Sequence, residues 1–465
     1  MRFFNTLTRR VDPFEPLHPG QVGLYTCGPT VYNYAHVGNF RAYIFEDLLR
    51  RVLKHAGLAV KQVMNLTDVD DKTIRGSKQA GLPLTEFTRT YKDAFFQDLK
   101  TLAIEPAEFY PAATDHISEM IVLIGILMRK GFAYQSEDKS VYFSIAKFPE
   151  YGKLAHLDKT GLKAGARVAQ DEYEKENLAD FALWKAWDEK DGAVAWDSPW
   201  GRGRPGWHIE CSAMAMKYLG ESFDIHTGGV DNAFPHHEDE MAQSEAATGK
   251  PFVRYWMHCA HLVVEGKKMS KSLGNFFTLR DILAKGYSGR EIRYVLLSAH
   301  YRQALNFCFD ALDGARASLS RIDEFRARME QMAATTPSAD AVLPSYARQA
   351  RRIFFDSLED DLGVSQALGA LFDLILEGNK AANDGKLTPG EARDIVFLLN
   401  EFDALLGVLS KPADLIDPAV KSLADQRQAA RQTKNWAEAD RIRDEMARLG
   451  WSVKDTAKGP QLKRL

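Results

Sequence analysis

Residues 27–39 read Cys-Gly-Pro-Thr-Val-Tyr-Asn-Tyr-Ala-His-Val-Gly-Asn and join an apolar strand pattern that starts at Gly23 to a helical pattern. The helical pattern places an apolar residue at every fourth position, at Phe40, Ile44, Leu48 and Val52, as one face of an amphipathic helix does. A Gly/Pro turn between a strand and a helix is typical of a doubly wound α/β domain. Because the first N–H groups of a helix attract phosphate, residues 27–39 predict a phosphate-binding turn.

The rest of the chain extends this pattern. A second strand candidate, Val60–Leu66, ends in the polar run 67–72, and a third, Phe223–His226, runs into Thr-Gly-Gly and another helical pattern. We predict an α/β fold, namely a split Rossmann-type parallel-sheet catalytic domain with an insertion, followed by an α-helical domain and a small C-terminal module. The expected boundaries are 1–110 and 206–300 for the catalytic halves, 111–205 for the insertion, 301–405 for the helical bundle and 406–465 for the terminal module.

Composition limits the class of protein. The 465 residues are 45% hydrophobic and 26% charged, a composition that argues against a disordered chain. The 60 Lys and Arg against 63 Asp and Glu give a net charge of −3, so any contact with nucleic acid must use a local basic patch. The four cysteines form no Cys-x-x-Cys pair, so a disulfide framework is disfavoured. The most apolar stretch, Met120–Met128, is too short to cross a bilayer. We expect a soluble cytoplasmic protein without a membrane segment.

A second motif, Lys268-Met269-Ser270-Lys271-Ser272, is flanked by Gly266 and Gly274. Such a loop can close over a polyphosphate and neutralise its charge, although a solvated basic loop is the plainer interpretation. In the first motif His36 and Asn39 can donate to a phosphate and Gly38 lets a flat base approach the backbone. A purely structural turn is the alternative there.

Together the two motifs resemble the HIGH and KMSKS signatures of class I aminoacyl-tRNA synthetases, with His36–Asn39 and Lys268–Ser272 in those places. Residues 27–32, 65–72, 205–212 and 234–238 are similar to motifs of the cysteinyl-tRNA synthetase family. The resemblance implies that L-cysteine reacts with ATP to give cysteinyl-adenylate and pyrophosphate, and that cysteine then passes to the 3′ end of tRNA(Cys). It also implies that the catalytic residues are His36, Asn39, Lys268 and Lys271.

Metal-ligating residue types stand at Cys27, Cys211, His236 and Glu240, and the last two are four residues apart on one predicted helix face. Two thiolates, one imidazole and one carboxylate can hold one zinc ion. From spacing alone ordinary structural roles stay open, and His237 is a rival ligand that the helix rotates away by about 100°. The family resemblance places one Zn²⁺ at these four positions. Cys259 and Cys308 are expected to be small buried residues.

The resemblance further implies that Thr67, Trp207 and His226 line the amino-acid site. It assigns ATP to His36, Gly38, Asn39, Gly229, Asp231 and Lys271, and Mg²⁺ is expected to arrive with ATP. A capping threonine, a core tryptophan and a turn aspartate are the structural alternatives.

The C-terminal segment is locally basic. A helix predicted over Arg431–Leu449 carries Arg441, Arg443 and Arg448, and Trp436 and Trp451 are interleaved with the cations, which suits RNA stacking as well as an ordinary core. The resemblance implies an anticodon module in which Trp436 contacts tRNA.

The chain departs from the family's usual sequence pattern at two places, residues 360–365 and Asn39 of the first signature. A cysteine ligase of the mycothiol pathway and an inactive RNA-binding paralogue are the rival interpretations. We expect a monomer.

Overall fold

The computed structural model describes residues 1–157, 167–168, 180–270, 274–334, 342–409, 418–456 and 459–464. The chain forms two compact units, Met1–Val408 and Leu409–Leu465, which are treated separately below. None of the helices in these ranges combines the length and the hydropathy that crossing a bilayer requires.

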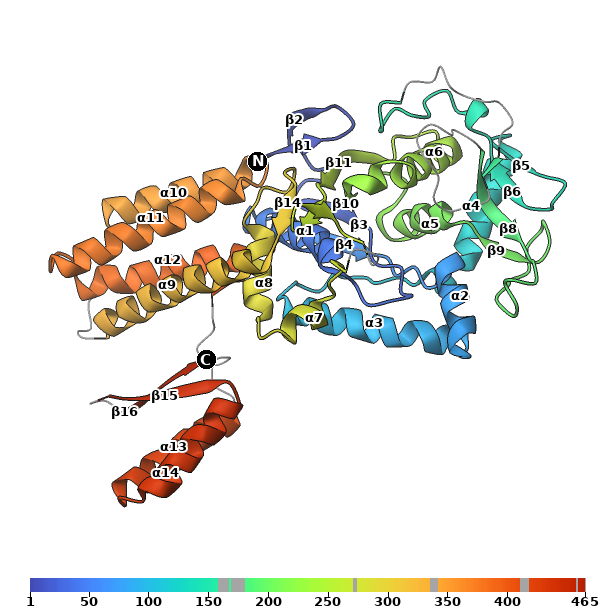
Figure 1. Ribbon diagram of the computed structural model, residues 1–465. Coiled ribbons are helices and arrows are strands. Elements are labelled where there is room, and N and C mark those ends of the chain that lie inside the picture. Colours follow the sequence, from blue (N-terminus) through green and yellow to red (C-terminus); the bar gives the residue numbers. More distant parts are fainter. Residues whose placement is uncertain are drawn as a thin grey trace. The chain divides into compact units, whose positions relative to one another are not determined.

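A four-stranded parallel sheet lies at the centre of the first unit (Figure 1). Its strand order is β11-β10-β3-β4, made by β3 (Gln21–Thr26), β4 (Ala59–Met64), β10 (Phe223–Gly229) and β11 (Val253–Cys259). β10 pairs in parallel with β3, although about 200 residues separate them in the sequence. The sheet is therefore completed by two distant parts of the chain, which confirms the predicted split α/β fold.

Helices follow the strands in the order that a doubly wound domain requires. α1 (Val37–His55) packs on β4, β10 and β11, whereas α5 (Trp207–Leu219) packs on β3, β4 and α6 (His236–Thr248). α2 (Asp71–Ala80) and α3 (Leu84–Thr101) follow β4. Because all four strands are parallel, the loops that enter α1, α2 and α6 all leave the carboxyl edge of the sheet, where α/β proteins bind ligands.

Between the two halves of the sheet lies the insertion. It begins with η1 (Ala113–His116) and α4 (Ile117–Arg129), and it carries a small second sheet that is visible at the right of Figure 1. The strands of that sheet are β5 (Ala133–Gln135), β6 (Val141–Phe143), β7 (Arg167–Val168), β8 (Asp180–Ala186) and β9 (Gly203–Pro205), with η2 (Ile145–Lys147) between β6 and β7. The apolar stretch noted in the sequence lies within α4, where Met120, Leu123, Ile124 and Leu127 form the buried face and Val122 is exposed.

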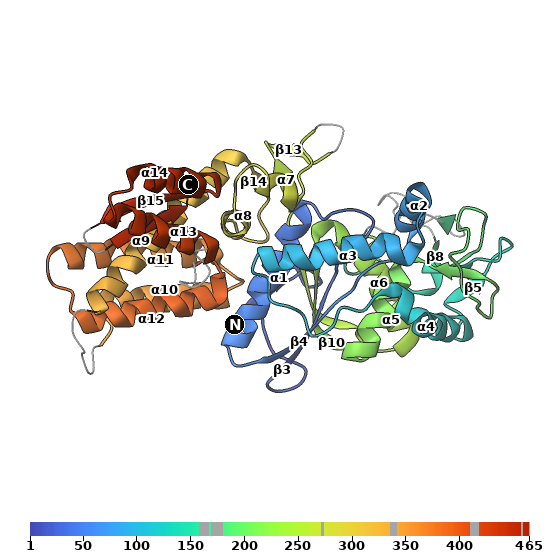
Figure 2. The same cartoon turned by 90° about the horizontal axis from the view of Figure 1, so that it is seen from below.

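The N-terminal residues form a hairpin, β1 (Arg2–Asn5) and β2 (Arg10–Pro13), and the N–H of Thr6 donates to the carbonyl of Trp256 in β11 at 2.8 Å. A short 3₁₀ helix, η4 (Val230–Ala233), links β10 to α6. After β11 come a sheet of β12 (Leu262–Val264), β13 (Lys267–Lys268) and β14 (Leu305–Phe307), and the helices α7 (Leu279–Leu283) and α8 (Gly289–Leu297). α7 lies beside α3 (Figure 2), where Arg280 Nη1 is 2.7 Å from Asp98 Oδ2.

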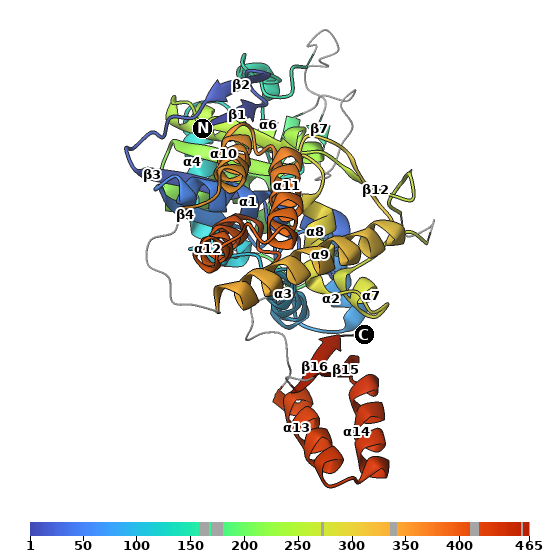
Figure 3. The same ribbon diagram turned by 90° about the vertical axis from the view of Figure 1, so that its left-hand side faces the viewer.

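The predicted helical domain consists of α9 (Phe309–Ala333), α10 (Ser345–Glu359), α11 (Val364–Asn383) and α12 (Pro389–Leu406), which pack as a bundle (Figure 3). Thr388 caps α12 by accepting from the N–H of Glu391, and Gly407 ends it in the left-handed region with φ 62°. A capping box at the first turn and a left-handed glycine after the last turn are common signals for the start and the end of a helix.

The second unit contains α13 (Pro418–Gln432), α14 (Trp436–Arg448) and a hairpin of β15 (Trp451–Thr456) and β16 (Gly459–Arg464). The single helix predicted over 431–449 is wrong, because Lys434 adopts a left-handed φ of 59° and Asn435 caps a new helix. Trp451 is only 7% exposed in the core of this unit, so it is unsuited to stacking on RNA. Trp436 is 55% exposed.

A buried ion pair between α8 and α1 connects the sheet domain to the helical bundle. The guanidinium of Arg293 in α8 is fully buried; it lies 2.5 Å from Asp47 Oδ2 of α1 and donates to the carbonyls of Leu102 and Leu406 at 3.0 and 2.6 Å. These contacts tie the ends of α3 and α12 to α1. Removing one partner of such a pair leaves a charge in a low-dielectric interior.

We expect Asp47→Asn to lower the free energy of unfolding by about 3 kcal/mol, because Arg293 loses its counter-charge. Asp323→Asn is the matched control, since Asp323 pairs with the more exposed Arg290 of the same helix and should cost less than about 1 kcal/mol. Denaturant titration of both variants measures the two values. Equal losses would show that the buried pair does not fasten the helices.

Candidate functional site

The predicted metal ligands come together at the carboxyl edge of the sheet. Cys27 follows β3, Cys211 lies within α5, and His236 and Glu240 occupy the first turns of α6. Their ligand atoms all lie within 4.8 Å of one another, and each of the four side chains is buried. The i, i+4 pair has the expected proximity, with His236 Nε2 3.0 Å from Glu240 Oε1. Two thiols, an imidazole and a carboxylate in this arrangement could hold a metal ion.

A second quartet overlaps the first. Cys27, His226, His237 and Glu240 also bring their ligand atoms within 4.8 Å. Nε2 of His237 is 3.2 Å from Cys27 Sγ, and Nε2 of His226 is 3.0 Å from Glu240 Oε2. The rotation of His237 along α6 does not carry it away from the cluster, because its ring reaches Cys27, which belongs to both quartets. Helix geometry alone therefore underestimated His237.

Two further histidines border the cluster and were missed from the sequence. His208 Nδ1 is 2.9 Å from His236 Nδ1, and His258 Nε2 is 2.8 Å from His237 Nδ1. His208 follows Trp207 within residues 205–212, one of the stretches similar to the cysteinyl-tRNA synthetase family, and this position is a sequence signal for a residue near the cluster. His258 lies near the end of β11 with no local motif, so only the tertiary structure identifies it.

Charges inside the cluster compensate one another. A hydrogen bond to Cys211, together with burial, raises the pKa of the Cys27 thiol well above its usual value. Burial would also raise the pKa of Cys211, but the Cys27 hydrogen bond and His236 lower it to about 6. Burial opposes the charge on Glu240 and on His236. The charges of His226 and His236 nevertheless lower the pKa of Glu240 to about 2, and those of Glu240 and Cys211 raise the pKa of His236 to about 10. Protons thus occupy the place where a metal cation would supply positive charge.

The first signature begins α1 with a capping box. Nδ1 of His36 accepts from the N–H of Asn39 at 3.2 Å, and Oδ1 of Asn39 accepts from the N–H of His36 at 3.0 Å. Both side chains therefore have a structural role as N-terminal caps, whatever else they bind. This role explains why asparagine is compatible with the position.

The second signature lies against the first. A Cβ placed on Gly38 would come within 3.1 Å of Met269 Cε, and the N–H of Val37 donates to the carbonyl of Phe277 at 2.9 Å. Asn275 holds the loop, accepting from the N–H of Ser270 at 2.8 Å. Lys268 ends β13 and is exposed, whereas Lys271 lies outside the described residues. The two phosphate-binding candidates thus meet at one place on the sheet edge.

The three residues expected to line the amino-acid site fall into two groups. Trp207 and His226 border the metal cluster, with the Trp207 ring centroid 4.3 Å from that of His236. Thr67 is buried under the loop after Cys27, where its carbonyl accepts from the N–H of Val31 at 3.0 Å. Trp207 and His226 therefore lie beside the cluster, whereas Thr67 lies beneath the neighbouring loop.

The residues expected near adenosine lie at the end of β10. Asp231 is exposed on η4, and a Cβ on Gly229 would stand 2.4 Å from its carboxylate oxygen Oδ1. The Asp231 carboxylate therefore approaches the backbone of Gly229 closely, and a side chain at position 229 would have to displace it.

Comparison with known proteins agrees with this architecture. The family model described as "tRNA synthetases class I (C) catalytic domain" matches residues 13–317, that of the "DALR domain" matches 353–410, and that of the "Cysteinyl-tRNA ligase anticodon binding domain" matches 413–462. Among solved structures, a Mycobacterium tuberculosis methionyl-tRNA synthetase in complex with methionyl-adenylate has a TM-score of 0.60 and 16% identity, over 83% of this chain and 87% of that one. The fold and the site thus define a class I aminoacyl-tRNA synthetase.

Sequence relatives narrow the class. The Protochlamydia amoebophila protein named "Cysteine--tRNA ligase" is 51% identical over 100% of this chain and 98% of its own length. The protein of that name from Chlamydia pneumoniae is 50% identical, also over 100% of this chain and 98% of its own length. The chain belongs to the cysteine–tRNA ligase family.

The two overlapping quartets can be told apart by substitution. We expect the ion to take the quartet with two thiolates, because thiolate is the stronger ligand for borderline-soft cations. Cys211→Ala, which affects only that quartet, should weaken Co²⁺ binding by more than about 100-fold, whereas His226→Phe should weaken it by about tenfold through the lost Glu240 contact. Competition with a chromophoric chelator gives both affinities, and the reverse order would assign the ion to the histidine-rich quartet.

Proposed function

We propose that this chain activates L-cysteine with ATP and transfers the cysteinyl group to the 3′ end of tRNA(Cys). The observation that carries the proposal is the buried two-thiol cluster beside the two signatures at one edge of the sheet. The names of the full-length relatives state the same activity for those proteins.

Selectivity for cysteine would come from one Zn²⁺ held by Cys27, Cys211, His236 and Glu240. The donor set fits this ion, since two thiols, an imidazole and a carboxylate are the ligands zinc takes in proteins. When bound, zinc prefers a thiolate to a hydroxyl, which separates cysteine from serine where pocket size could not. Glu240, the hardest of the four ligands, is the one expected to loosen when a substrate thiolate arrives.

This chain's own residues would shape the rest of the amino-acid site. Trp207 covers His236 and is half-buried, so its ring shields the cluster from water. His226, which contacts Glu240, holds that carboxylate in place. We assign Thr67 to the same site because it supports the loop that follows Cys27.

Activation takes place at the phosphates of ATP, which we place at the junction of the two signatures. His36, Asn39, Lys268 and Lys271 would stabilise negative charge as pyrophosphate departs from the α-phosphorus. Gly38, Gly229 and Asp231 would contact the adenosine, and Mg²⁺ would arrive with ATP. In-line positioning and electrostatics suffice here, so no side chain has to act as a covalent nucleophile.

The small C-terminal unit is proposed to contact the anticodon of tRNA. Trp436 is exposed, and the guanidinium carbon of Arg431 lies 5.4 Å from its ring centroid. An exposed indole beside a cation is suited to stacking on an unpaired base. We retain the expected division 1–110, 111–205, 206–300, 301–405 and 406–465, together with a cytoplasmic, monomeric protein, as parts of this proposal.

Cysteine-dependent exchange of pyrophosphate into ATP tests the first reaction, and charging of tRNA(Cys) by the same zinc-loaded preparation tests the second. We expect cysteine to support exchange and serine to be at least about 100-fold less effective, because only the thiolate suits the metal site. Exchange without charging would favour a ligase that couples cysteine to a small molecule. The absence of exchange would leave only an RNA-binding protein.

A further inference from the structure

The side chain of Glu210 is a buried carboxylate beside the metal cluster. It lies in the first turn of α5, next to the predicted metal ligand Cys211, and it is fully shielded from solvent. Neither of its two oxygens meets a donor in hydrogen-bond geometry among the residues that the structure describes. Because buried polar groups are nearly always paired, an unpaired carboxylate points to a catalytic role or to an ion that it binds.

Other buried carboxylates in this region each accept a hydrogen bond. Asp68 accepts from a lysine ammonium at 2.6 Å, and Asp70 accepts from a backbone N–H of α2 at 2.7 Å. Glu46 of α1 accepts from the Thr227 hydroxyl at 3.0 Å through one of its oxygens. Within the described residues, Glu210 differs from these three carboxylates in that neither of its oxygens is engaged.

Several acidic groups surround Glu210. Burial raises the pKa of its carboxyl well above the usual value, and the charges of Cys211, Asp70 and Asp68 raise this pKa further. The side chain of Thr67 acts in the opposite direction and lowers it. An excess of negative groups in a low-dielectric interior attracts a cation. A cation bound near Thr67 would relieve the repulsion among these groups.

Thr67 links Glu210 to the loop that carries the other thiol. Oγ1 of Thr67 accepts from Asn65 Nδ2 at 3.1 Å, and Oδ1 of the same amide accepts from the N–H of Gly28 at 2.9 Å. Gly28 follows Cys27, and a Cβ on Gly28 would collide with the carbonyl oxygen of Asn65, so the two loops are in backbone contact. Because Asn65 uses one lone pair of the hydroxyl, Thr67 can direct its proton to Glu210 and still accept one further hydrogen bond.

The remaining lone pair of Thr67 is suited to an ammonium group. In cysteine the α-ammonium group stands on the carbon next to the one that bears the sulfur, so a sulfur held at the cluster brings the ammonium group close to it. We propose that Glu210, acting through the Thr67 hydroxyl, positions the α-ammonium group of the substrate, an inference that rests on the proposed function. The hydroxyl accepts from the ammonium group, and the buried carboxylate supplies a counter-charge that water does not screen. The site then recognises cysteine by its amine as well as by its thiol.

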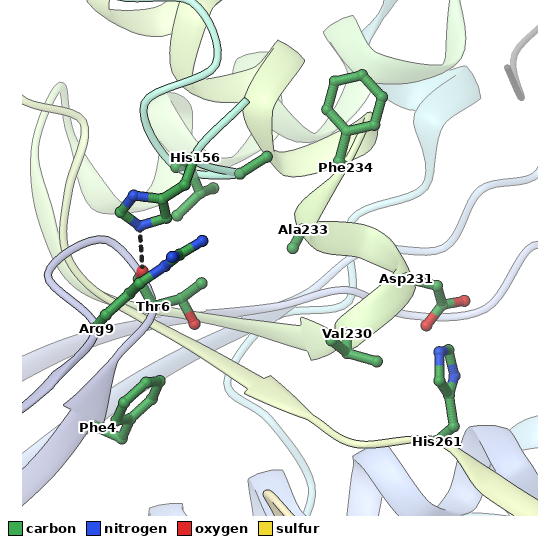
Figure 4. Close-up of a pocket in the computed structure, with 11 residues that line it drawn as sticks. Phe4, Thr6, Arg9, His156, Val230, Asp231, Ala233, Phe234 and His261 are labelled. Carbon is green, nitrogen blue, oxygen red and sulfur yellow. Dashed lines mark hydrogen bonds between the residues drawn. The ribbon is translucent and has the colours of Figure 1, made fainter. Parts of the chain in front are cut away.

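Asp231 is a rival carboxylate at the same edge of the sheet. It lies on the wall of a cavity of about 480 Å³, across from Arg9 and His156 (Figure 4). Its side chain is exposed, so water screens its charge, and the proposed function assigns it to adenosine. Glu210 is shielded and adjoins a thiol of the cluster, which favours it as the counter-charge of the ammonium group.

Binding of two thiols to the full-length, cobalt-loaded protein tests the proposal. Cysteine and 3-mercaptopropionate have the same thiol and carboxylate, but only cysteine has an amine, and the absorption of the cobalt–thiolate bond reports the binding of each. Glu210→Gln keeps the size of the side chain and removes its charge. We expect this variant to bind cysteine at least about tenfold more weakly than the parent protein does, and 3-mercaptopropionate no more weakly, because the counter-charge favours only the amine.

Glu46→Gln is the matched control, since Glu46 is also a fully buried carboxylate and its charge acts on Cys27. It should change the binding of the two thiols by the same factor. In pyrophosphate exchange, Glu210→Gln should raise the KM for cysteine by at least about tenfold and leave the KM for ATP within about twofold. Should Glu210→Gln fail to fold, Thr67→Val, which removes only the hydroxyl, carries the same prediction for the two thiols.

Equal weakening of both thiols by Glu210→Gln would show that Glu210 has only a structural role, and unchanged binding of cysteine would also overturn the proposal. Loss of the preference for cysteine in Asp231→Asn but not in Glu210→Gln would assign the ammonium group to Asp231. If the parent protein binds both thiols equally, the proposal fails while the proposed function stands. If the parent protein prefers cysteine yet supports no cysteine-dependent exchange, the proposed function fails, and the comparison of thiols still tests Glu210.

Discussion

The arrangement of the catalytic edge depends on the burial of Cys27, Cys211, His236 and Glu240 in one cluster. Moving a thiolate and a carboxylate out of water costs several kcal/mol for each ion unless a positive charge compensates them. Protons on the neighbouring groups supply part of that charge, as the opposite pKa shifts of His236 and Glu240 indicate. A divalent cation would supply it more completely. β3, α5 and α6 can therefore pack closely around polar groups that would otherwise oppose folding.

The signatures depend on the same edge of the sheet. β3 ends at Thr26, Cys27 follows it, and α1 begins at Val37 after the N-cap His36, so one loop fixes both Cys27 of the cluster and the first signature. Arg41 of α1 donates to the carbonyls of Ala299 and His300 at 2.9 and 2.8 Å, which connects this helix to the segment preceding the bundle. The first signature and the helical domain that follows are thereby joined through a single helix, which begins ten residues after Cys27 of the cluster.

The sequence was sufficient to predict those parts of the molecule whose signals are local. The strand-turn-helix at 23–52 has a clear periodicity, and the i, i+4 pair of His236 and Glu240 follows from helix geometry. What failed required contacts between distant segments. His258 lies on β11, beside β10 in the completed sheet, and no local pattern shows that its ring reaches His237 of α6. The break before α14 depends on the conformation of Lys434, and the burial of Trp451 depends on the packing of a whole unit. Cys308, expected to be buried, is only half-buried at the start of α9.

The central claim is that the cluster selects cysteine by direct contact between a bound zinc ion and the substrate sulfur. Zinc K-edge absorption spectroscopy on the full-length, zinc-loaded protein measures the sulfur neighbours of the ion directly. The account predicts two sulfur neighbours in the free protein, a third when cysteine is added, and no change with serine. A sulfur count that stays at two in saturating cysteine would contradict it, and selectivity would then have to come from the surrounding ring of Trp207, His226 and His237.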